Sequence, residues 1–395
     1  MRVASSGTAR SRLAGAACVV VVAVASSGCA SKASTGSGSS GGGTPVGIAV
    51  GGPLSGQYAR AGQETLHAVQ IAVDEANAAG GVNGRQVRVV QGDDQGDPQG
   101  GQSVAQKFCD DASVLAVVGH YNSGVTIPAS SVYQKCGLAE ATPLSSNPQV
   151  TERGLPNIFR VGARDDYMGP AVAAYVATKT DMRRVSTIDD QSAYGVGLVG
   201  QFTTTAKQRG LNIVKSAAIK AGDKDFRAVL GTLPKDTQLI YFGGYPSDAA
   251  LLAQQAREVG LNATLAGGDG LYDPDLLKGK DAVEGTILAA SAGNPTGAAQ
   301  GFVGTYKAKY GAPSGYGLLE YNAARMVLQA MSQAPTLSRN IVVKQLHGIS
   351  YRPVEGGDPI VFDAKGDNTN ALVHIFVVKH ADFNEVAVVK PAEFK

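Results

Sequence analysis

The chain has 395 residues, of which 44% are hydrophobic and 17% are charged, and its formal net charge is +2. Arg2, Arg10 and Arg12 lie in the first 28 residues, which contain no acidic residue. The remainder therefore carries 32 basic residues (35 minus 3) against 33 acidic ones. This balance excludes a strongly basic surface for nucleic acid, so no nucleic-acid partner is expected.

The N-terminus predicts export. Residues 14–25 (AGAACVVVVAVA) follow the three arginines and are all apolar. Twelve residues in a helix span about 18 Å, which is short of the roughly 30 Å hydrocarbon core of a membrane. A signal peptide therefore fits better than a membrane anchor. Ser26-Ser27-Gly28-Cys29 resembles a bacterial lipobox, so we expect residues 1–28 to be a lipoprotein signal peptide and Cys29 the lipid anchor. Ordinary signal cleavage with Cys29 left as a free thiol is the alternative.

A Gly/Ser-rich stretch follows the predicted anchor. Residues 29–44 contain no apolar side chain larger than alanine after the cysteine, which is typical of a flexible tether. We expect a protein that is secreted across the cytoplasmic membrane and held on its outer face only by lipid. The roughly 350 residues beyond the tether suffice for two domains.

Two further cysteines, Cys109 and Cys136, remain in this exported part. An even pair in an oxidising compartment predicts a disulfide bond. Closing a loop of 28 residues would stabilise the fold by about 3.5 kcal/mol. Two buried free thiols are the alternative.

Short apolar runs alternate with segments of helical periodicity. In the first series, strands are predicted at 46–50, 87–90, 114–118 and 138–142, with helices that end at Gly80-Gly81, begin at Asp97-Pro98 and run through 128–134. In the second series, strands are predicted at 184–188, 211–218, 239–242, 264–266 and 286–290, with helices near 168–179, 195–209, 224–233 and 247–259. Three helical stretches are predicted within 298–347, and late strands at 360–363 and 372–378. Such alternation predicts parallel sheets covered on both faces, hence two doubly wound α/β lobes.

Motifs of enzymes are absent from the sequence. There is no HExxH, CxxC, GxxxxGK[ST] or GxSxG motif, and no metal site or cofactor is expected. The five histidines are predicted to be surface or packing residues: His67, His120, His347, His374 and His380. Residues 195–200 match GxGxxG, but the first glycine does not follow a strand directly and no acid lies near residue 215. These glycines are predicted to ease helix packing, and the chain is predicted not to be an enzyme.

Ligands of open α/β sheets bind at the carboxyl ends of the strands. In the first series, residues 119–124 and 143–148 place hydroxyls and free N–H groups at these ends, which suits an anionic group. In the second series, residues 189–194, 243–245 and 267–270 contribute tyrosines and acids. Hydroxyls on one wall and carboxylates on the other indicate a zwitterionic ligand.

Eight motifs in order resemble the leucine/isoleucine/valine-binding protein family, the type I periplasmic binding proteins of branched-chain amino acid importers. They are GPLSG (52–56), DEANAAGGVNGR (74–85), DDQGDP (93–98), VVGHYNSGVTIPAS (117–130), SSNPQVTERG (145–154), YGVGL (194–198), FGGY (242–245) and FDAKGDN (362–368). The resemblance covers residues 45–395 and implies two lobes joined by a three-strand hinge. We expect lobe 1 to comprise residues 45–164 plus 292–356, and lobe 2 residues 165–291 plus 357–395.

The resemblance also implies roles for single residues in binding an amino acid. Ser123, by its hydroxyl and N–H, and the N–H of Ser146 would hold the α-carboxylate. The carbonyl of Leu144, the hydroxyl of Ser146 and Asp269 would hold the α-ammonium. Further expected contacts are Ser145 in the same turn, Tyr194 and Tyr245 from lobe 2, and Asp165 near the hinge. Asp269 stands where the family has glutamate, so its reach is one methylene shorter.

The side-chain end of the expected pocket departs from the family. Tyr121 and Asn122 stand where the branched-chain binders have smaller or less polar residues, which admits a polar or aromatic amino acid. Structural roles are the alternatives for the other residues. Ser123 and Ser146 could cap helices, Asp269 could be a turn residue, and the tyrosines could be interlobe packing.

The function that follows is capture of a free amino acid by hinge closure, and delivery to the permease of an ABC transporter. The protein is expected to act as a monomer. A sensor or receptor that uses the same fold is one alternative. Another is a binder of amides, urea or aromatic acids, which lack the ammonium group that Asp269 would hold.

Overall fold

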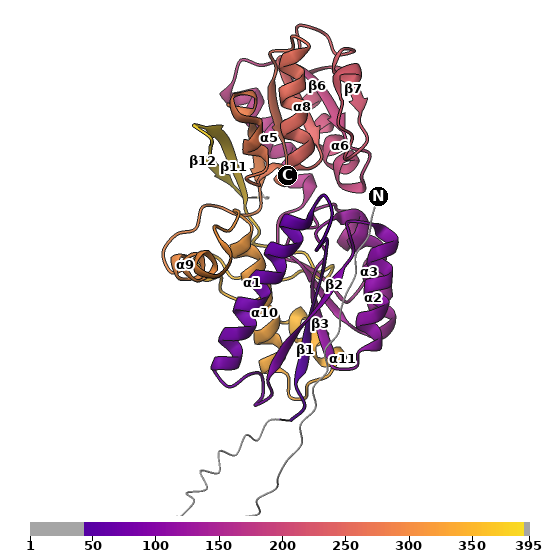
Figure 1. Ribbon diagram of the computed structural model, residues 1–395, viewed down its shortest axis with the longest axis vertical. Coiled ribbons are helices and arrows are strands. Elements are labelled where there is room, and N and C mark those ends of the chain that lie inside the picture. Colours follow the sequence, from indigo (N-terminus) through magenta and orange to yellow (C-terminus); the bar gives the residue numbers. More distant parts are fainter. Residues whose placement is uncertain (1–42, 391–395) are drawn as a thin grey trace, which may run out of the picture. The chain divides into compact units, whose positions relative to one another are not determined.

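A computed structural model describes residues 43–390, which form two β-sheets with helices on both faces of each (Figure 1). The predicted signal peptide, the anchor Cys29 and nearly all of the predicted tether lie outside these residues. No helix between residues 43 and 390 combines the length and the apolar character that crossing a membrane requires.

The first sheet, with its helices, is lobe 1. Its strands lie in the order β2-β1-β3-β4-β5, and every pair is parallel. They are β1 (Val46–Gly52), β2 (Val87–Asp93), β3 (Val114–Gly119), β4 (Ala139–Thr142) and β5 (Ile158–Arg160). The helices are α1 (Ala59–Ala78), α2 (Pro98–Asp110), α3 (Ser123–Cys136), α4 (Gln149–Glu152), α9 (Ala299–Tyr310), α10 (Gly317–Gln333) and α11 (Arg339–His347).

Both faces of this sheet are buried, as a parallel sheet requires. Successive residues of β1 show the alternation: Ile48 and Val50 pack on the side of α1 and α10, whereas Ala49 packs on the side of α2 and α3. The predicted helix ends are confirmed. The side chain of Asp97 accepts a hydrogen bond from the N–H of Gly100, and Gly80 adopts a positive φ of 102° just beyond α1.

The second sheet, with its helices, is lobe 2. Its strands lie in the order β12-β11-β10-β9-β8-β6-β7, with β6 to β10 parallel and β11 and β12 antiparallel. They are β6 (Arg184–Asp189), β7 (Asn212–Ala218), β8 (Leu239–Gly243), β9 (Thr264–Gly267), β10 (Ile287–Ala290), β11 (Val373–Lys379) and β12 (Asp382–Val389). The helices are α5 (Asp165–Lys179), α6 (Ala193–Gln208), α7 (Arg227–Leu230) and α8 (Pro246–Glu258), with 3₁₀ helices η1 (Asp269–Leu271) and η2 (Leu276–Val283).

Three crossovers connect the lobes within the described residues: one between β5 and α5, one between β10 and α9, and one between α11 and β11. The predicted fold class, two doubly wound lobes with a three-strand hinge, is therefore confirmed. Ile360 and Phe362 pack in the core of lobe 1, so the last crossover leaves that lobe only beyond them. The boundaries assigned to each lobe stay a prediction.

Two local predictions are wrong, and an edge strand was missed. Residues 360–363 form no strand, because Ile360 and Phe362 each make one isolated bridge and find no continuous partner. The helix predicted at 224–233 is reduced to α7, since the N–H of Phe226 bonds to the side chain of Gln255 and helical geometry begins only afterwards. The edge strand β12 was not predicted, because its residues are mostly exposed and show no apolar run.

The predicted disulfide is confirmed. Cys109 near the end of α2 is bonded to Cys136 at the end of α3, with their Cα atoms 5.7 Å apart. The bond ties together the two helices that cover one face of lobe 1.

Candidate functional site

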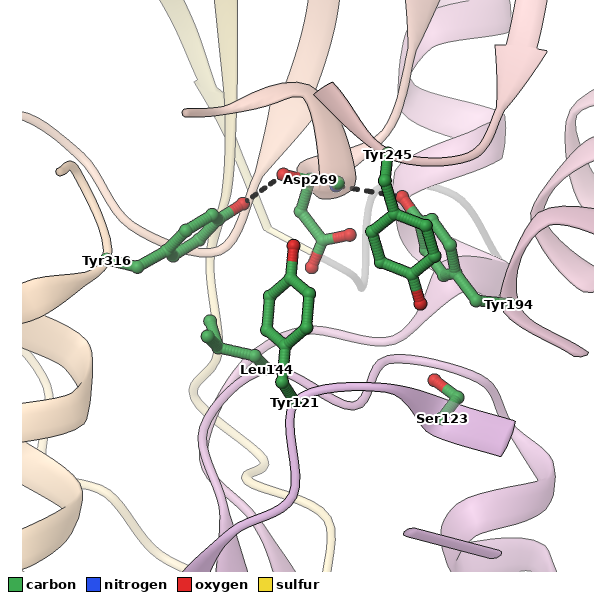
Figure 2. A pocket seen from close by; sticks show the side chains of 8 residues that line it. Tyr121, Ser123, Leu144, Tyr194, Tyr245, Asp269 and Tyr316 are labelled. Atoms are coloured by element: carbon green, nitrogen blue, oxygen red, sulfur yellow. Dashed lines mark hydrogen bonds between the residues drawn. The ribbon is translucent and has the colours of Figure 1, made fainter. Parts of the chain in front are cut away.

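A cavity of about 260 Å³ lies where the carboxyl ends of both sheets face each other (Figure 2). Lobe 1 contributes the turns after β3 and β4, and lobe 2 contributes the turns after β6, β8 and β9. The lining residues are Tyr121, Ser123, Leu144, Tyr194, Tyr245, Asp269, Gly270 and Tyr316. All but Tyr316 lie in the turns that the strand-end rule indicated, and six of them were named from the family resemblance: Tyr121, Ser123, Leu144, Tyr194, Tyr245 and Asp269.

The turn after β3 presents Ser123 to the cavity. Ser123 is the first residue of α3 and is buried, and its hydroxyl accepts a hydrogen bond from the N–H of Asn147 at 3.3 Å. Its hydroxyl therefore caps no helix. The same turn is anchored by His120, a packing histidine as predicted: its ring bonds to Asp94 at 2.5 Å and to Tyr133 at 2.9 Å.

The turn after β4 contains Leu144, Ser145 and Ser146. The hydroxyl of Ser145 donates to the carbonyl of His120 at 3.0 Å, so this side chain supports the turn and does not line the cavity. The Ser146 hydroxyl is buried without a hydrogen-bond partner in the described structure, and the Ser146 carbonyl accepts from the N–H of Asp165 at 2.9 Å. Ser146 is thus held by its backbone while its hydroxyl stays free.

Asp269 follows β9, at the start of η1, and is buried. Two bonds fix this turn in Figure 2: the Tyr316 hydroxyl donates to the Asp269 carbonyl at 2.8 Å, and the N–H of Gly270 donates to the Tyr194 hydroxyl at 2.9 Å. Burial raises the pKa of Asp269 to about 7, although the nearby hydroxyls of Tyr194 and Ser146 act to lower it.

Asp165 is the first residue of α5, is fully buried and is not among the lining residues of the cavity. Burial raises its pKa well above the usual range, and the charge of Asp269 raises it further. Neither carboxylate oxygen of Asp165 has a hydrogen-bond partner in the described structure. No lysine, arginine or histidine is among the lining residues of the described cavity. The lining thus offers the buried carboxyl of Asp269 without a basic side chain beside it, whereas the charge of buried Arg160 acts to lower the pKa of Asp165.

Tyrosines form the wall that closes the cavity between the lobes. The ring centroid of Tyr245 lies 5.6 Å from that of Tyr121, 4.5 Å from that of Tyr58 and 5.4 Å from that of Tyr194. Tyr58 and Tyr121 belong to lobe 1, whereas Tyr194 and Tyr245 belong to lobe 2. The predicted roles of the tyrosines in lining the site and in interlobe packing thus coincide.

Polar bonds also join the two rims of the site. The Gln57 amide donates to Asp248 at 3.1 Å, Arg60 pairs with Asp273 at 3.1 Å, and the Asn147 amide donates to the carbonyl of Ala193 at 2.6 Å. The two lobes are therefore in contact around the cavity.

Two of the three glycines that match GxGxxG, Gly195 and Gly197, lie in close contacts as predicted, whereas Gly200 has open space around it. A Cβ atom on Gly195 would lie 2.3 Å from the carboxylate of Asp190, and one on Gly197 would lie 2.6 Å from the amide of Asn147. The second of these contacts joins α6 to lobe 1. Among residues 43–390, no three His, Cys, Asp or Glu side chains are grouped as a metal site would require.

The prediction missed Tyr316 and Tyr58. Tyr316 precedes α10 and follows no strand, so the strand-end rule could not find it. Tyr58 lies in the loop after β1, a strand end to which the same rule applies. Asn122 was predicted to line the pocket but does not, and its side-chain carbonyl is buried without a partner in the described structure.

Two α/β lobes whose strand ends meet around a small cavity define the class of two-lobed ligand-binding proteins. A family model described as periplasmic binding protein matches residues 45–382. Leu/Ile/Val-binding protein homolog 1 of Brucella suis is 34% identical over 325 residues, covering 81% of this chain and 86% of that protein.

Two solved structures show the same fold. Leucine binding protein LivK of Thermotoga maritima is 28% identical, with a TM-score of 0.79, covering 88% of this chain and 99% of its own. The substrate binding protein LivJ of Streptococcus pneumoniae, solved in complex with isoleucine, is 26% identical, with a TM-score of 0.80 over 88% of this chain and 100% of its own. The chain belongs to the periplasmic binding protein family, and it is a binding protein and not an enzyme.

Proposed function

We propose that this protein captures a free amino acid outside the cytoplasmic membrane and delivers it to the permease of an ABC transporter. One observation carries the proposal: the buried carboxyls of Asp165 and Asp269 lie beside the serine turns of lobe 1 with no basic side chain among the lining residues. An α-ammonium group would supply the missing positive charge. The named functions of the relatives, leucine/isoleucine/valine binding and isoleucine binding, support the same ligand class.

The α-carboxylate would be held by lobe 1. Ser123 and Ser146 are buried hydroxyl residues of the two turns that face lobe 2, and α3 begins at Ser123. The N-terminus of a 14-residue helix carries partial positive charge and free N–H groups, which suit an anion. The Leu144 carbonyl and Asp269 would share the ammonium.

The ligand side chain would lie between Tyr121, Leu144 and Tyr316, which line the cavity. With no cation among the lining residues, a second carboxylate on the ligand would be buried unpaired. We therefore propose a neutral amino acid. Closure of the lobes would bury it beneath Tyr194 and Tyr245, and the closed form would dock on the permease as a monomer.

The test is a thermal-shift screen of the purified protein with the twenty common amino acids, followed by calorimetry of the best binders. The panel also contains carboxamides, urea and benzoate. Binding of neutral amino acids, and rejection of glutamate, is the expected result. Tight binding of urea or benzoate with no response to any amino acid would overturn the proposal.

The membrane attachment is proposed from the sequence alone. Cys29 would carry the lipid and residues 29–44 would tether the lobes to it. Expression of the full chain and of Cys29→Ala, with phase separation in Triton X-114, tests this attachment. The unchanged chain should enter the detergent phase and the variant the aqueous phase. Equal partitioning of both would contradict the lipid anchor.

A further inference from the structure

Arg160, the last residue of β5, is 1% exposed and is the largest fully buried side chain of the described residues. Its guanidinium donates to the Ser145 carbonyl at 3.2 Å and to the Asn147 carbonyl at 2.7 Å. It also bonds to the Thr151 hydroxyl and to Asp367, the latter at 2.8 Å. An arginine is thus buried directly beneath the turn that contains Ser146.

These contacts orient the turn. The Ser145 carbonyl and the Ser146 N–H belong to one trans peptide plane, so they point in opposite directions. Because Arg160 holds the carbonyl on its own side, the N–H of Ser146 is directed away from Arg160. The Asn147 carbonyl, held by the same guanidinium, fixes the other end of the turn. The peptide group between Ser146 and Asn147 is fixed as well, because the backbone N–H of Asp165 donates to the Ser146 carbonyl at 2.9 Å.

Arg160 also connects the turn to the hinge. Its N–H donates to the Gly366 carbonyl at 2.7 Å, and its own carbonyl accepts from the N–H of Asn368 at 3.1 Å. Asp367 therefore lies in the last crossover, beside the first one. Arg164, which belongs to the first crossover, donates to Asp367 at 2.7 Å.

The buried charges of this cluster compensate one another. Burial alone would raise the pKa of Asp367, but Arg160 and Arg164 lower it below its usual value. Asp367 therefore stays ionised at neutral pH and forms an ion pair with Arg160. A buried arginine whose donors are occupied by two carbonyls, one hydroxyl and one carboxylate is a rigid support.

We propose that Arg160, together with Asp367, is a positioning residue for ligand binding. It holds the N–H of Ser146 toward the ligand carboxylate and couples that turn to two of the three crossovers. This inference rests on the proposed function, because it assigns Arg160 a role in recognising the carboxylate of an amino acid.

A lysine at position 160 keeps the positive charge but cannot hold two carbonyls and a carboxylate in one plane. Arg160→Lys should therefore loosen the Ser146 turn without removing the charge. The matched control is Arg339→Lys. Arg339 belongs to lobe 1 and is not among the residues that line the ligand cavity. It donates to five backbone carbonyls, those of Phe108, Cys109, Asp111, Val114 and Cys136.

The readout separates carboxylate recognition from general damage. L-leucine and L-alanine are titrated by calorimetry against each protein, alongside L-leucinamide and L-alaninamide, which retain the ammonium but lack the carboxylate. In Arg160→Lys, the ratio of amino acid affinity to amide affinity should fall tenfold or more. In Arg339→Lys it should stay within twofold of the unchanged protein, even though both variants melt at a lower temperature.

An unchanged ratio in folded Arg160→Lys would overturn the proposal and leave Arg160 a structural residue. If that variant does not fold, Asp367→Asn replaces it, because the amide keeps the shape but releases Arg160; the ratio should then fall at least threefold, and an unchanged ratio overturns the proposal. If the unchanged protein binds neither amino acid nor any other in the panel, the proposed function itself has failed. That result is visible before any variant is made, and this proposal falls with it.

Discussion

The charge of Asp269 acts on Asp165: both carboxyls are buried, and each lies close enough to Ser146 for its hydroxyl to lower their pKa. One of the pair follows β9 and the other begins α5, so lobe 2 supplies both. Two buried carboxyls in one place disfavour full ionisation until a cation arrives. The ammonium group of an amino acid would relieve this repulsion, and this relationship leads to the first two predictions.

Asp269→Ala should weaken amino acid binding on the order of 30-fold or more, because removing one partner of a desolvated charge pair costs about 2–5 kcal/mol. The melting temperature without ligand should not fall, since no protein cation loses a partner. Calorimetry and thermal melts measure the two effects. Asp190→Asn is the control: Asp190 is a buried carboxyl of the same lobe that does not line the cavity, and its replacement should alter affinity less than twofold. Unaltered affinity in Asp269→Ala would remove Asp269 from the site.

Affinity should also depend on pH. Burial raises the pKa of Asp269 to about 7 in the unliganded protein, so the carboxyl must lose its proton to accept an ammonium group. Between pH 5 and 7 the affinity should rise with pH, by at most tenfold per unit, and then level off.

The free energy of unfolding without ligand should fall as the pH rises, whereas the affinity rises. The folded state holds the Asp269 proton up to about pH 7, whereas the unfolded state loses it near pH 4. This stabilising contribution is complete below about pH 4 and disappears as the pH rises through 7. Calorimetry and melts across this range, with Asp269→Asn as the comparison, measure both slopes. In Asp269→Asn, the pH dependence that comes from Asp269 should disappear from both the affinity and the stability. Identical slopes in both proteins would contradict the assignment of these slopes to Asp269.

Leu144 is predicted to limit the size of the ligand side chain. Leu144→Ala keeps the backbone carbonyl but opens the cavity, so affinity for L-phenylalanine relative to L-alanine should rise roughly tenfold or more. Leu138→Ala removes a buried leucine from a different cluster of lobe 1 and is the control for lost stability. Competition calorimetry gives the ratio in each protein. A ratio that shifts equally in both variants would mean that Leu144 does not touch the ligand.

Much of the fold could be predicted because its parallel strands are buried on both faces. All residues of β1, β3 and β8 are buried, so these strands are continuous apolar runs in the sequence. β12 carries no such signal, because it is an exposed antiparallel edge. Where the last crossover leaves lobe 1 depends on contacts of Ile360 and Phe362 that no local pattern encodes.

The site residues also divide into those that the strand order predicts and those that depend on tertiary contacts. Ser123, Tyr194, Tyr245 and Asp269 follow or lie near strand ends, so topology alone brings them together. Tyr316 reaches the cavity only because the chain returns to lobe 1 after β10 and begins α10 there. The burial that raises the pKa of Asp269 arises from both lobes, and residues of one lobe could not predict it.

The disulfide should matter for stability and not for binding. Cys109 and Cys136 lie in lobe 1 and neither lines the cavity, while the closed loop spans a sequence separation of 27 residues. In the chain-entropy view, replacing both with serine should lower the free energy of unfolding by about 3.5 kcal/mol. Urea denaturation measures this loss, and dithiothreitol added to the unchanged protein should reproduce it. Amino acid affinity in the double variant should stay within twofold, because the turns after β3 and β4 are anchored by His120 and Arg160 and not by the disulfide. A larger loss of affinity would mean that the packing of α2 against α3 is transmitted to Ser123 at the start of α3.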